Sequence, residues 1–285
     1  GGVVFDVFEE RRQFIVVERV ILGFELRAGA GKLAFAGGDV RSRAAEGLSM
    51  TGIGLRGILF DLDGVLIDSG RDIMNAVNWS LARHGLAPLA YETVRRHIGH
   101  GAAELLARCF AEHGPEYAET ARVALPEYKA NYLAHSIVET VLYPGVVEGL
   151  ARLEAAGLRM AVVTNKPGAL ADQILTLLGI RAHFGCLVTP ELLTRMKPDP
   201  EGLQLAMSEL GLSPEHTVMA GDTWSDIEAG RLAGTRTIGA LWGLGDPEGV
   251  RRERPDWLAE DFASLTETLL AAMADTGRAQ LRLQE

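Results

Sequence analysis

Short apolar runs alternate with amphipathic stretches along the chain from residue 55 onward. The runs are apolar on both faces, which is typical of strands in a parallel sheet covered by helices on each side. The predicted strands are Gly57–Asp61, Arg159–Thr164, Cys186–Thr189, Thr217–Gly221, Thr235–Leu241 and Trp257–Leu258. The predicted helices between them are Val147–Ala156, Gly168–Leu178, Glu201–Leu210 and Ser225–Ala233. This alternation predicts a doubly wound, Rossmann-like α/β fold with a parallel sheet.

One long segment interrupts this rhythm. From residue 69 to residue 143, helical patterns follow one another without a convincing strand. We therefore expect an α-helical domain, residues 69–143, inserted between the first and the second strand of the core. Asp68-Ser69-Gly70 and Tyr143-Pro144-Gly145 consist largely of turn formers, so they are the expected hinges.

The two ends of the chain differ from its middle. The first 49 residues carry seven acidic and seven basic residues, and Met50 stands shortly before the first predicted strand. We expect residues 1–49 to be an N-terminal extension, either disordered or a small appendage. The core domain would then comprise residues 50–68 and 144–274, and the charged residues 275–285 would form a flexible tail.

Net charge, hydropathy and cysteine content disfavour several classes of protein. The formal net charge is −10, which disfavours general attraction to nucleic acid or to an anionic membrane. The most apolar N-terminal run is too short and too charged to span a bilayer. Cys109 and Cys186 have no CxxC companion, so neither a disulfide framework nor a zinc site is indicated. We expect a cytoplasmic protein, a monomer or a homodimer.

The strongest chemical signal directly follows the first predicted strand, in Phe60-Asp61-Leu62-Asp63-Gly64. In open α/β sheets, ligands bind beyond the carboxyl ends of the strands, which is where Asp61 and Asp63 fall. Two carboxylates this close need a cation or a shared proton. The pair suits a metal site with one nucleophilic carboxylate and one proton carrier. Taken alone, an ordinary Asp-Gly turn explains the same residues.

Three further signals follow in order beyond later predicted strands. Thr164 and Asn165 open a helix, where a hydroxyl, an amide and free N–H groups can cradle a phosphate. Lys197 precedes a proline turn and can offset phosphate charge. Asp222 and Asp226 are one helical turn apart and suit Mg²⁺ or its waters. Each has an ordinary structural explanation, but chance would have to place all four at successive strand ends.

The joint pattern resembles the haloacid dehalogenase superfamily, whose four motifs appear in this order, and the likeness spans roughly residues 56–270. The resemblance implies that Asp61 is the nucleophile and Asp63 the general acid/base, as in the phosphatases of the superfamily, with Lys197 steadying Asp61. It implies that the phosphoryl group is bound by Thr164, Asn165, Lys197 and Gly64. The implied cofactor is Mg²⁺, held by Asp61, the backbone carbonyl of Asp63, Asp222 and Asp226.

The helical insert has a likeness of its own. The stretch from Val94 to Gly101 resembles the cap domain of phosphoglycolate phosphatases, which implies a small-molecule phosphate ester as substrate. Arg96 and His100 are the expected partners of a substrate carboxylate. Inorganic pyrophosphatases and sugar-phosphate phosphatases or mutases share the same helical cap, so these activities stay open. A catalytically silent binding module is the alternative of another class, although no motif acid is missing.

Overall fold

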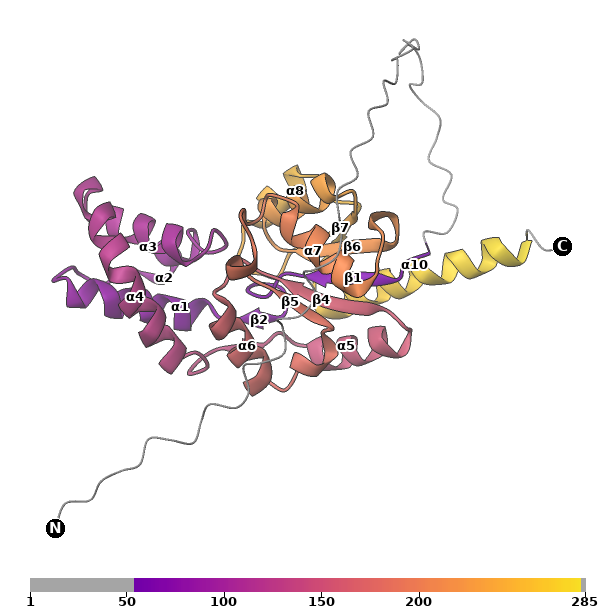
Figure 1. Ribbon diagram of the computed structural model, residues 1–285, viewed down its shortest axis with the longest axis horizontal. Coiled ribbons are helices and arrows are strands. Elements are labelled where there is room, and N and C mark those ends of the chain that lie inside the picture. Colours follow the sequence, from indigo (N-terminus) through magenta and orange to yellow (C-terminus); the bar gives the residue numbers. More distant parts are fainter. Residues whose placement is uncertain (1–53, 283–285) are drawn as a thin grey trace, which may run out of the picture. The chain divides into compact units, whose positions relative to one another are not determined.

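A six-stranded parallel sheet forms the centre of the fold (Figure 1). The computed structural model describes residues 54–282, with side chains up to residue 273. The sheet has the order β5-β4-β1-β6-β7-β8, so β1 lies in the middle. Its strands are β1 (Gly57–Phe60), β4 (Arg159–Val163), β5 (Cys186–Val188), β6 (Thr217–Gly221), β7 (Arg236–Ala240) and β8 (Trp257–Ala259). The predicted doubly wound sheet is confirmed.

Helices cover both faces of this sheet, which explains why its strands are apolar throughout. On β1, Ile58 and Phe60 face one apolar cluster and Leu59 faces another. Phe60 stacks on Phe262, with ring centroids 5.9 Å apart. The first cluster is completed by α5 (Val146–Ala155), α6 (Gly168–Leu177) and α10 (Phe262–Arg282), and the second by α7 (Glu201–Leu210) and α8 (Trp224–Ala233). The short helix α9 (Pro247–Arg252) contacts β7.

A helical segment is inserted after β1. It consists of α1 (Gly70–Arg83), α2 (Tyr91–Arg95), α3 (Ala102–Ala111) and α4 (Ala118–Ala134), which pack against one another (Figure 1). We call residues 69–143 the cap. Asp72 on α1 joins the two ends of the cap, because its carboxylate accepts hydrogen bonds from the backbone N–H of Glu139 and from the N–H and hydroxyl of Thr140.

Two short strands connect the cap to the core. β2 (Ile67–Asp68) and β3 (Val141–Leu142) pair antiparallel, with Ile67 opposite Leu142. The Tyr143 N–H also donates to the Leu66 carbonyl, at 3.1 Å. The two expected hinges therefore lie side by side. Sequence reasoning missed these strands because two residues are too few to show an alternating pattern.

The boundaries of other elements differ slightly from the prediction. The strands of the large sheet lie within one or two residues of their predicted ends. Helix α10 continues through residue 282, so residues 275–282 are helical, whereas the sequence assigned 275–285 to a flexible tail. The predicted extension, residues 1–49, lies outside the described residues. Across the described part of the chain, no helix combines the length and apolar character that a membrane span requires.

Candidate active site

Three of the predicted motifs meet because their strands are neighbours. β1 lies between β4 and β6, and the chain changes from one half of the sheet to the other at this point. Asp61 follows β1, Thr164 follows β4 and Asp222 follows β6. The Asp61 N–H donates to the Ala220 carbonyl at 2.9 Å, which extends the pairing of β1 with β6 up to the site. Parallel strands therefore bring together residues as far apart in the sequence as Asp61 and Asp222, which are 161 positions apart.

Lys197, the remaining predicted motif, lies beside Asp61 as well. Its ammonium Nζ lies 2.9 Å from Asp61 Oδ1 and 2.7 Å from Asp226 Oδ1, and it donates to the Val163 carbonyl at 2.7 Å. Burial would lower the pKa of Lys197, but the charges of Asp226 and Asp61 outweigh burial and hold this pKa above its usual value. Lys197 is therefore a permanent cation between two buried carboxylates.

Two opposing influences set the pKa of Asp61. Burial raises its pKa to about 6, against the opposing influence of Lys197. The carboxyl group is thus ionised at neutral pH without being strongly stabilised in that form. A carboxylate that is held charged but only partly solvated is suited to act as a nucleophile.

Asp61, Asp222 and Asp226 form a group of buried carboxylates whose nearest oxygens lie within 4.8 Å of one another. Burial raises the pKa of Asp222 well above its usual value, and the charges of Asp226 and Asp61 add to this effect. Asp222 Oδ1 is buried and has no hydrogen-bond partner among the described residues. A buried carboxylate oxygen without a donor fits a divalent cation, which prefers oxygen ligands. The residues present therefore suit Mg²⁺.

Gly64 makes room for Asp222. It has a φ of +87°, and a Cβ at this position would collide with the Asp222 carboxylate. The Gly64 N–H donates to the Ile67 carbonyl at 2.9 Å, so it is already engaged in the turn. Asp226 is also engaged, because its Oδ2 accepts from the N–H and the hydroxyl of Thr223 at the start of α8.

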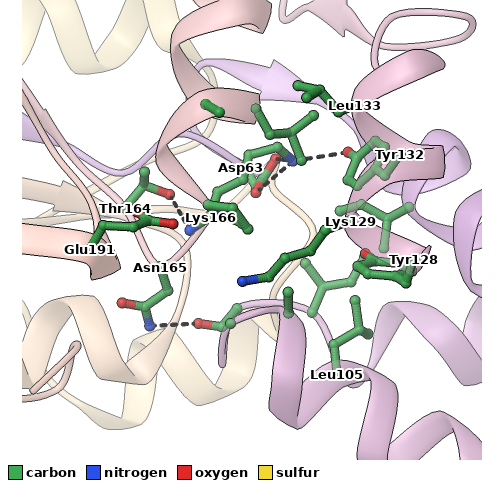
Figure 2. A pocket seen from close by; sticks show the side chains of 18 of the residues that line it. Asp63, Leu105, Tyr128, Lys129, Tyr132, Leu133, Thr164, Asn165, Lys166 and Glu191 are labelled. Carbon is green, nitrogen blue, oxygen red and sulfur yellow. Dashed lines mark hydrogen bonds and ion pairs between the residues drawn. The ribbon is translucent and has the colours of Figure 1, made fainter. Parts of the chain in front are cut away.

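Asp63 lies in a separate network that includes the cap. Lys166 Nζ is 2.8 Å from Asp63 Oδ1 and donates to the hydroxyl of Tyr132 on α4 at 2.9 Å (Figure 2). The Ser69 hydroxyl also donates to Asp63 Oδ1. The Lys166 side chain is 3% exposed and that of Asp63 is 14% exposed. Cap and core residues together fix the orientation of the Asp63 carboxylate.

Thr164 and Asn165 have different surroundings. The Thr164 hydroxyl accepts from the Lys166 N–H at 3.1 Å, which leaves its own proton available. The Asn165 amide donates to the carbonyl of Gly99 in the cap at 2.9 Å, and its oxygen accepts from the Lys197 N–H at 3.2 Å. The Asn165 side chain therefore joins the cap to the loop that carries Lys197.

A cavity of about 250 Å³ lies between the cap and the ends of the strands. Asp61, Asp63, Thr164 and Asn165 line it from the core. From the cap, the lining is mainly apolar and aromatic, with Tyr128, Tyr132, Ile98, Leu105 and Leu133, and it includes Lys129 (Figure 2). The volume is below the range of pockets for drug-sized ligands, so the cavity suits a small metabolite.

The basic residues expected at the cap take other positions. The Arg96 guanidinium pairs with Glu112 at 2.8 Å, with its side chain 58% exposed, and it does not line the cavity. The His100 ring lies 6.3 Å from that of Trp224, and its Nδ1 is buried without a partner among the described residues. His100 is likewise absent from the cavity lining, although Gly99 and Gly101 on either side belong to it.

Comparison with known proteins identifies the family. The family model described as haloacid dehalogenase-like hydrolase matches residues 58–240, which include all four motifs. The chain belongs to the haloacid dehalogenase-like hydrolases. This hydrolase is 37% identical over 212 residues to a phosphoglycolate phosphatase of Colwellia psychrerythraea, covering 73% of this chain and 94% of that protein. It is 39% identical over 196 residues to an N-acetylmuramic acid 6-phosphate phosphatase of Pseudomonas aeruginosa, covering 68% of this chain and 85% of that protein.

A solved structure agrees with these relatives. The crystal structure of a predicted phosphoglycolate phosphatase from Haemophilus somnus superposes on the hydrolase with a TM-score of 0.68 and 28% sequence identity. The match covers 78% of this chain and all of that one. The sequence-based identification as a phosphoglycolate phosphatase-like hydrolase, and as a phosphoric monoester hydrolase, is confirmed.

Sequence reasoning about the hydrolase missed three residues that the structure brings to the site, namely Lys166, Tyr132 and Lys129. Lys166 contacts Asp63, Tyr132 contacts Lys166, and Lys129 lines the cavity. Arg95 of α2 donates to the carbonyls of Leu244 and Gly245 in the core, at 2.9 and 3.2 Å. Lys166 follows directly after the Thr-Asn pair, which was a usable signal. Arg95 lies in the stretch from Val94 to Gly101 that resembles a phosphatase cap, whereas Tyr132 and Lys129 show no sequence signal that separates them from surface positions on helices.

Proposed function

We propose that this hydrolase is a Mg²⁺-dependent phosphatase that acts on a small phosphorylated carboxylic acid of the phosphoglycolate type, through a phosphorylated Asp61. The observation that carries the proposal is the placement of Asp61. Its carboxylate lines a small cavity between the cap and the sheet, contacts Lys197, and lies beside the Asp222 carboxylate, one oxygen of which has no hydrogen-bond partner among the described residues.

Mg²⁺ would be held by Asp61, Asp222 and the backbone carbonyl of Asp63. Asp226, which also contacts Lys197, would support the ion directly or through water. When bound, Mg²⁺ supplies positive charge that screens the phosphoryl group from the carboxylates and stabilises charge on its oxygens. Lys197 contributes a further fixed positive charge, in direct contact with Asp61. These charges offset the repulsion between a carboxylate nucleophile and a phosphate dianion.

In the first step an oxygen of Asp61 attacks phosphorus, and the bond from phosphorus to the ester oxygen breaks. Asp63 gives its proton to the departing oxygen, as a general acid. In the second step Asp63, now ionised, takes a proton from water, and this water attacks the phosphorus of the aspartyl phosphate. Lys166 and Ser69 hold the Asp63 carboxylate in place for both steps. Inorganic phosphate leaves and Asp61 is restored.

The names of the relatives support the substrate class. One relative is named for phosphoglycolate and another for the 6-phosphate of N-acetylmuramic acid, and both compounds combine a phosphate ester with a carboxylate. The small volume of the cavity favours the smaller of the two. The amino-sugar phosphate is the second candidate because that relative is 39% identical to this chain.

The test is a comparison of kcat/KM values. The full chain with Mg²⁺ should be assayed on phosphoglycolate, N-acetylmuramic acid 6-phosphate, glucose 6-phosphate and pyrophosphate. We expect the highest kcat/KM for phosphoglycolate, with N-acetylmuramic acid 6-phosphate next. Preference for pyrophosphate, or conversion of a sugar phosphate to its isomer instead of hydrolysis, would contradict the proposal.

A further inference from the structure

Basic side chains at the cavity differ in whether they already have partners. Lys129 and Lys166 are the two basic residues in the lining formed by the described part of the chain. The ammonium group of Lys166 is fully occupied, since it contacts both oxygens of Asp63 and the Tyr132 hydroxyl. Lys129 forms no hydrogen bond or ion pair with any residue in the range 54–273. A substrate anion can therefore recruit Lys129 without breaking a hydrogen bond or ion pair, and competes only with the more distant charge of Glu191.

The position of Lys129 is set by helix α4. Tyr128 and Tyr132 on the same helix are buried, and Lys129 follows Tyr128 at the edge of the apolar wall. Figure 2 shows its side chain extending from α4 into the space that faces Asn165 and Lys166. The surrounding wall is apolar, with Ile98, Leu105 and Leu133. Apolar surroundings strengthen the attraction between Lys129 and an anion inside the cavity.

The core wall opposite contributes one further acid, Glu191. Its Oε2 accepts from the Gly168 N–H at the start of α6, at 3.0 Å. Burial alone would raise the pKa of Glu191, but hydrogen bonds from backbone N–H groups and from Thr189, together with the charge of Lys129, hold it below its usual value. Glu191 is therefore a fixed negative charge that competes with a substrate anion for Lys129.

We propose that Lys129 binds the carboxylate of the substrate, and that Glu191 opposes it, so that this pair sets the preference of the enzyme for phosphorylated acids over neutral phosphate esters. The inference rests on the proposed phosphatase function. In this arrangement the phosphoryl group lies against Asp61 and the carboxylate extends toward the cap. A neutral ester of the same length finds only water and Lys129 there and gains no ionic contact.

The experiment compares two esters of matched length, phosphoglycolate and 2-hydroxyethyl phosphate, which differ in a carboxylate against a hydroxymethyl group. The measured quantity is the ratio of kcat/KM for phosphoglycolate to that for 2-hydroxyethyl phosphate. Lys129→Met keeps the length of the side chain and removes its charge. Because Lys129 is an exposed residue in a mainly apolar lining, we expect this ratio to fall about five- to fiftyfold, mainly through KM. Lys129→Arg should restore most of it.

Glu191→Gln supplies a test with the opposite sign. Glutamine still accepts the hydrogen bond from Gly168, but it removes the opposing charge. The ratio should therefore rise, by about two- to fivefold. Arg96→Ala is the matched control for loss of a cap cation, since Arg96 pairs with Glu112 away from the cavity, and it should leave the ratio as it is.

The outcomes separate the inference from the function on which it rests. If the wild-type chain hydrolyses neither ester, the proposed function fails. If it hydrolyses both and Lys129→Met leaves the ratio unchanged, the Lys129 inference is wrong while the phosphatase function stands. A selective fall in His100→Ala, with none in Lys129→Met, would also overturn the inference and move the carboxylate contact to the loop at residues 99–101.

Discussion

Lys197 lies between Asp61 and Asp226, with its ammonium nitrogen 2.9 Å from one carboxylate and 2.7 Å from the other. All three side chains are less than a tenth exposed. Removing one member of a buried charge group is costly, because the remaining charges lose their partner without regaining water. Lys197 therefore stabilises the fold as well as the charge distribution at Asp61.

Lys197→Met should be destabilising and inactive. The loss of a buried cation with two carboxylate partners should cost about 3 kcal/mol or more, which lowers Tm by roughly 6–12 °C for a chain of this size. Without Lys197, the pKa of Asp61 should rise above its present value of about 6. An acid whose folded-state pKa is raised is most favourable to stability at low pH, and that contribution is lost as pH rises through the folded-state pKa. The Tm deficit should therefore be larger at pH 8 than at pH 5.

Lys166→Met is the matched control for this prediction. Lys166 is as deeply buried as Lys197, but its partner Asp63 is 14% exposed and can regain water. We expect a smaller loss of Tm in Lys166→Met, measured by differential scanning calorimetry. Equal losses in the two variants would show that burial of the lysine alone, and not the paired carboxylates, determines the cost.

Mg²⁺ should stabilise the protein in a pH-dependent way. Burial raises the pKa of Asp61 to about 6, and that of Asp222 well above its usual value. Protons therefore compete with Mg²⁺ for these carboxylates on the acid side, and the competition disappears as pH rises. At a concentration about tenfold above its dissociation constant, Mg²⁺ should add about 1.4 kcal/mol, or roughly 3–5 °C in Tm, at pH 8. The increase should be smaller at pH 5.

Asp222→Asn tests whether the increase comes from this site. The amide keeps the size of the side chain and lowers its affinity for a divalent cation. The rise in Tm with Mg²⁺ should disappear in this variant. A rise of the same size in Asp222→Asn, or an equal rise at pH 5 and pH 8 in the unaltered chain, would contradict a metal site at Asp61 and Asp222.

Arg95→Ala should weaken the contact between the cap and the core. The guanidinium of Arg95 donates to the carbonyls of Leu244 and Gly245, and the Gly245 N–H donates in turn to Asp222 Oδ2 at 2.9 Å. Loss of two charge-assisted hydrogen bonds at a partly exposed site should lower kcat/KM about tenfold. Because the contact does not involve the substrate, the loss should be equal for phosphoglycolate and for 2-hydroxyethyl phosphate.

Arg96→Ala is the control for the neighbouring position. It breaks only the exposed pair with Glu112, and exposed ion pairs contribute little because water screens them. Its kcat/KM should stay within about twofold of the starting value. If Arg96→Ala lowered kcat/KM as much as Arg95→Ala, the effect would come from folding of the cap and not from its contact with the core.

The core of the site could be predicted from sequence because a parallel sheet has simple geometry. Apolar runs identified the strands, and neighbouring parallel strands end at the same edge, so Asp61, Thr164 and Asp222 had to lie close together. Lys197 follows the end of β5, and its proline turn marked it as fixed in place. The motif order then indicated the family, which the family model confirmed.

The cap side of the cavity could not be predicted in the same way. Its residues reach the cavity through the packing of α4 and of the loop at residues 99–101 against the core, and neither contact leaves a pattern in the sequence. In the sequence, Lys129 cannot be told from a solvated lysine on a helix, and Arg96 is as plausible a partner for a substrate carboxylate as Lys129. Only the tertiary arrangement shows that Arg96 is paired with Glu112 whereas Lys129 faces the cavity.

Asp63→Asn allows the phosphorylation of Asp61 during turnover to be measured directly. p-Nitrophenyl phosphate has a leaving group that departs without a proton, so the first step should proceed in this variant. The second step needs Asp63 as a base and should stall. Rapid mixing of Asp63→Asn with Mg²⁺ and this ester should release a stoichiometric burst of p-nitrophenolate.

Mass spectrometry of the quenched protein should then find one phosphoryl group on the peptide that contains Asp61, and the double variant Asp61→Asn, Asp63→Asn should show neither burst nor modification. An unmodified Asp61 peptide, or a phosphoryl group on another residue, in a preparation whose wild-type form hydrolyses the same ester would contradict Asp61 as the nucleophile.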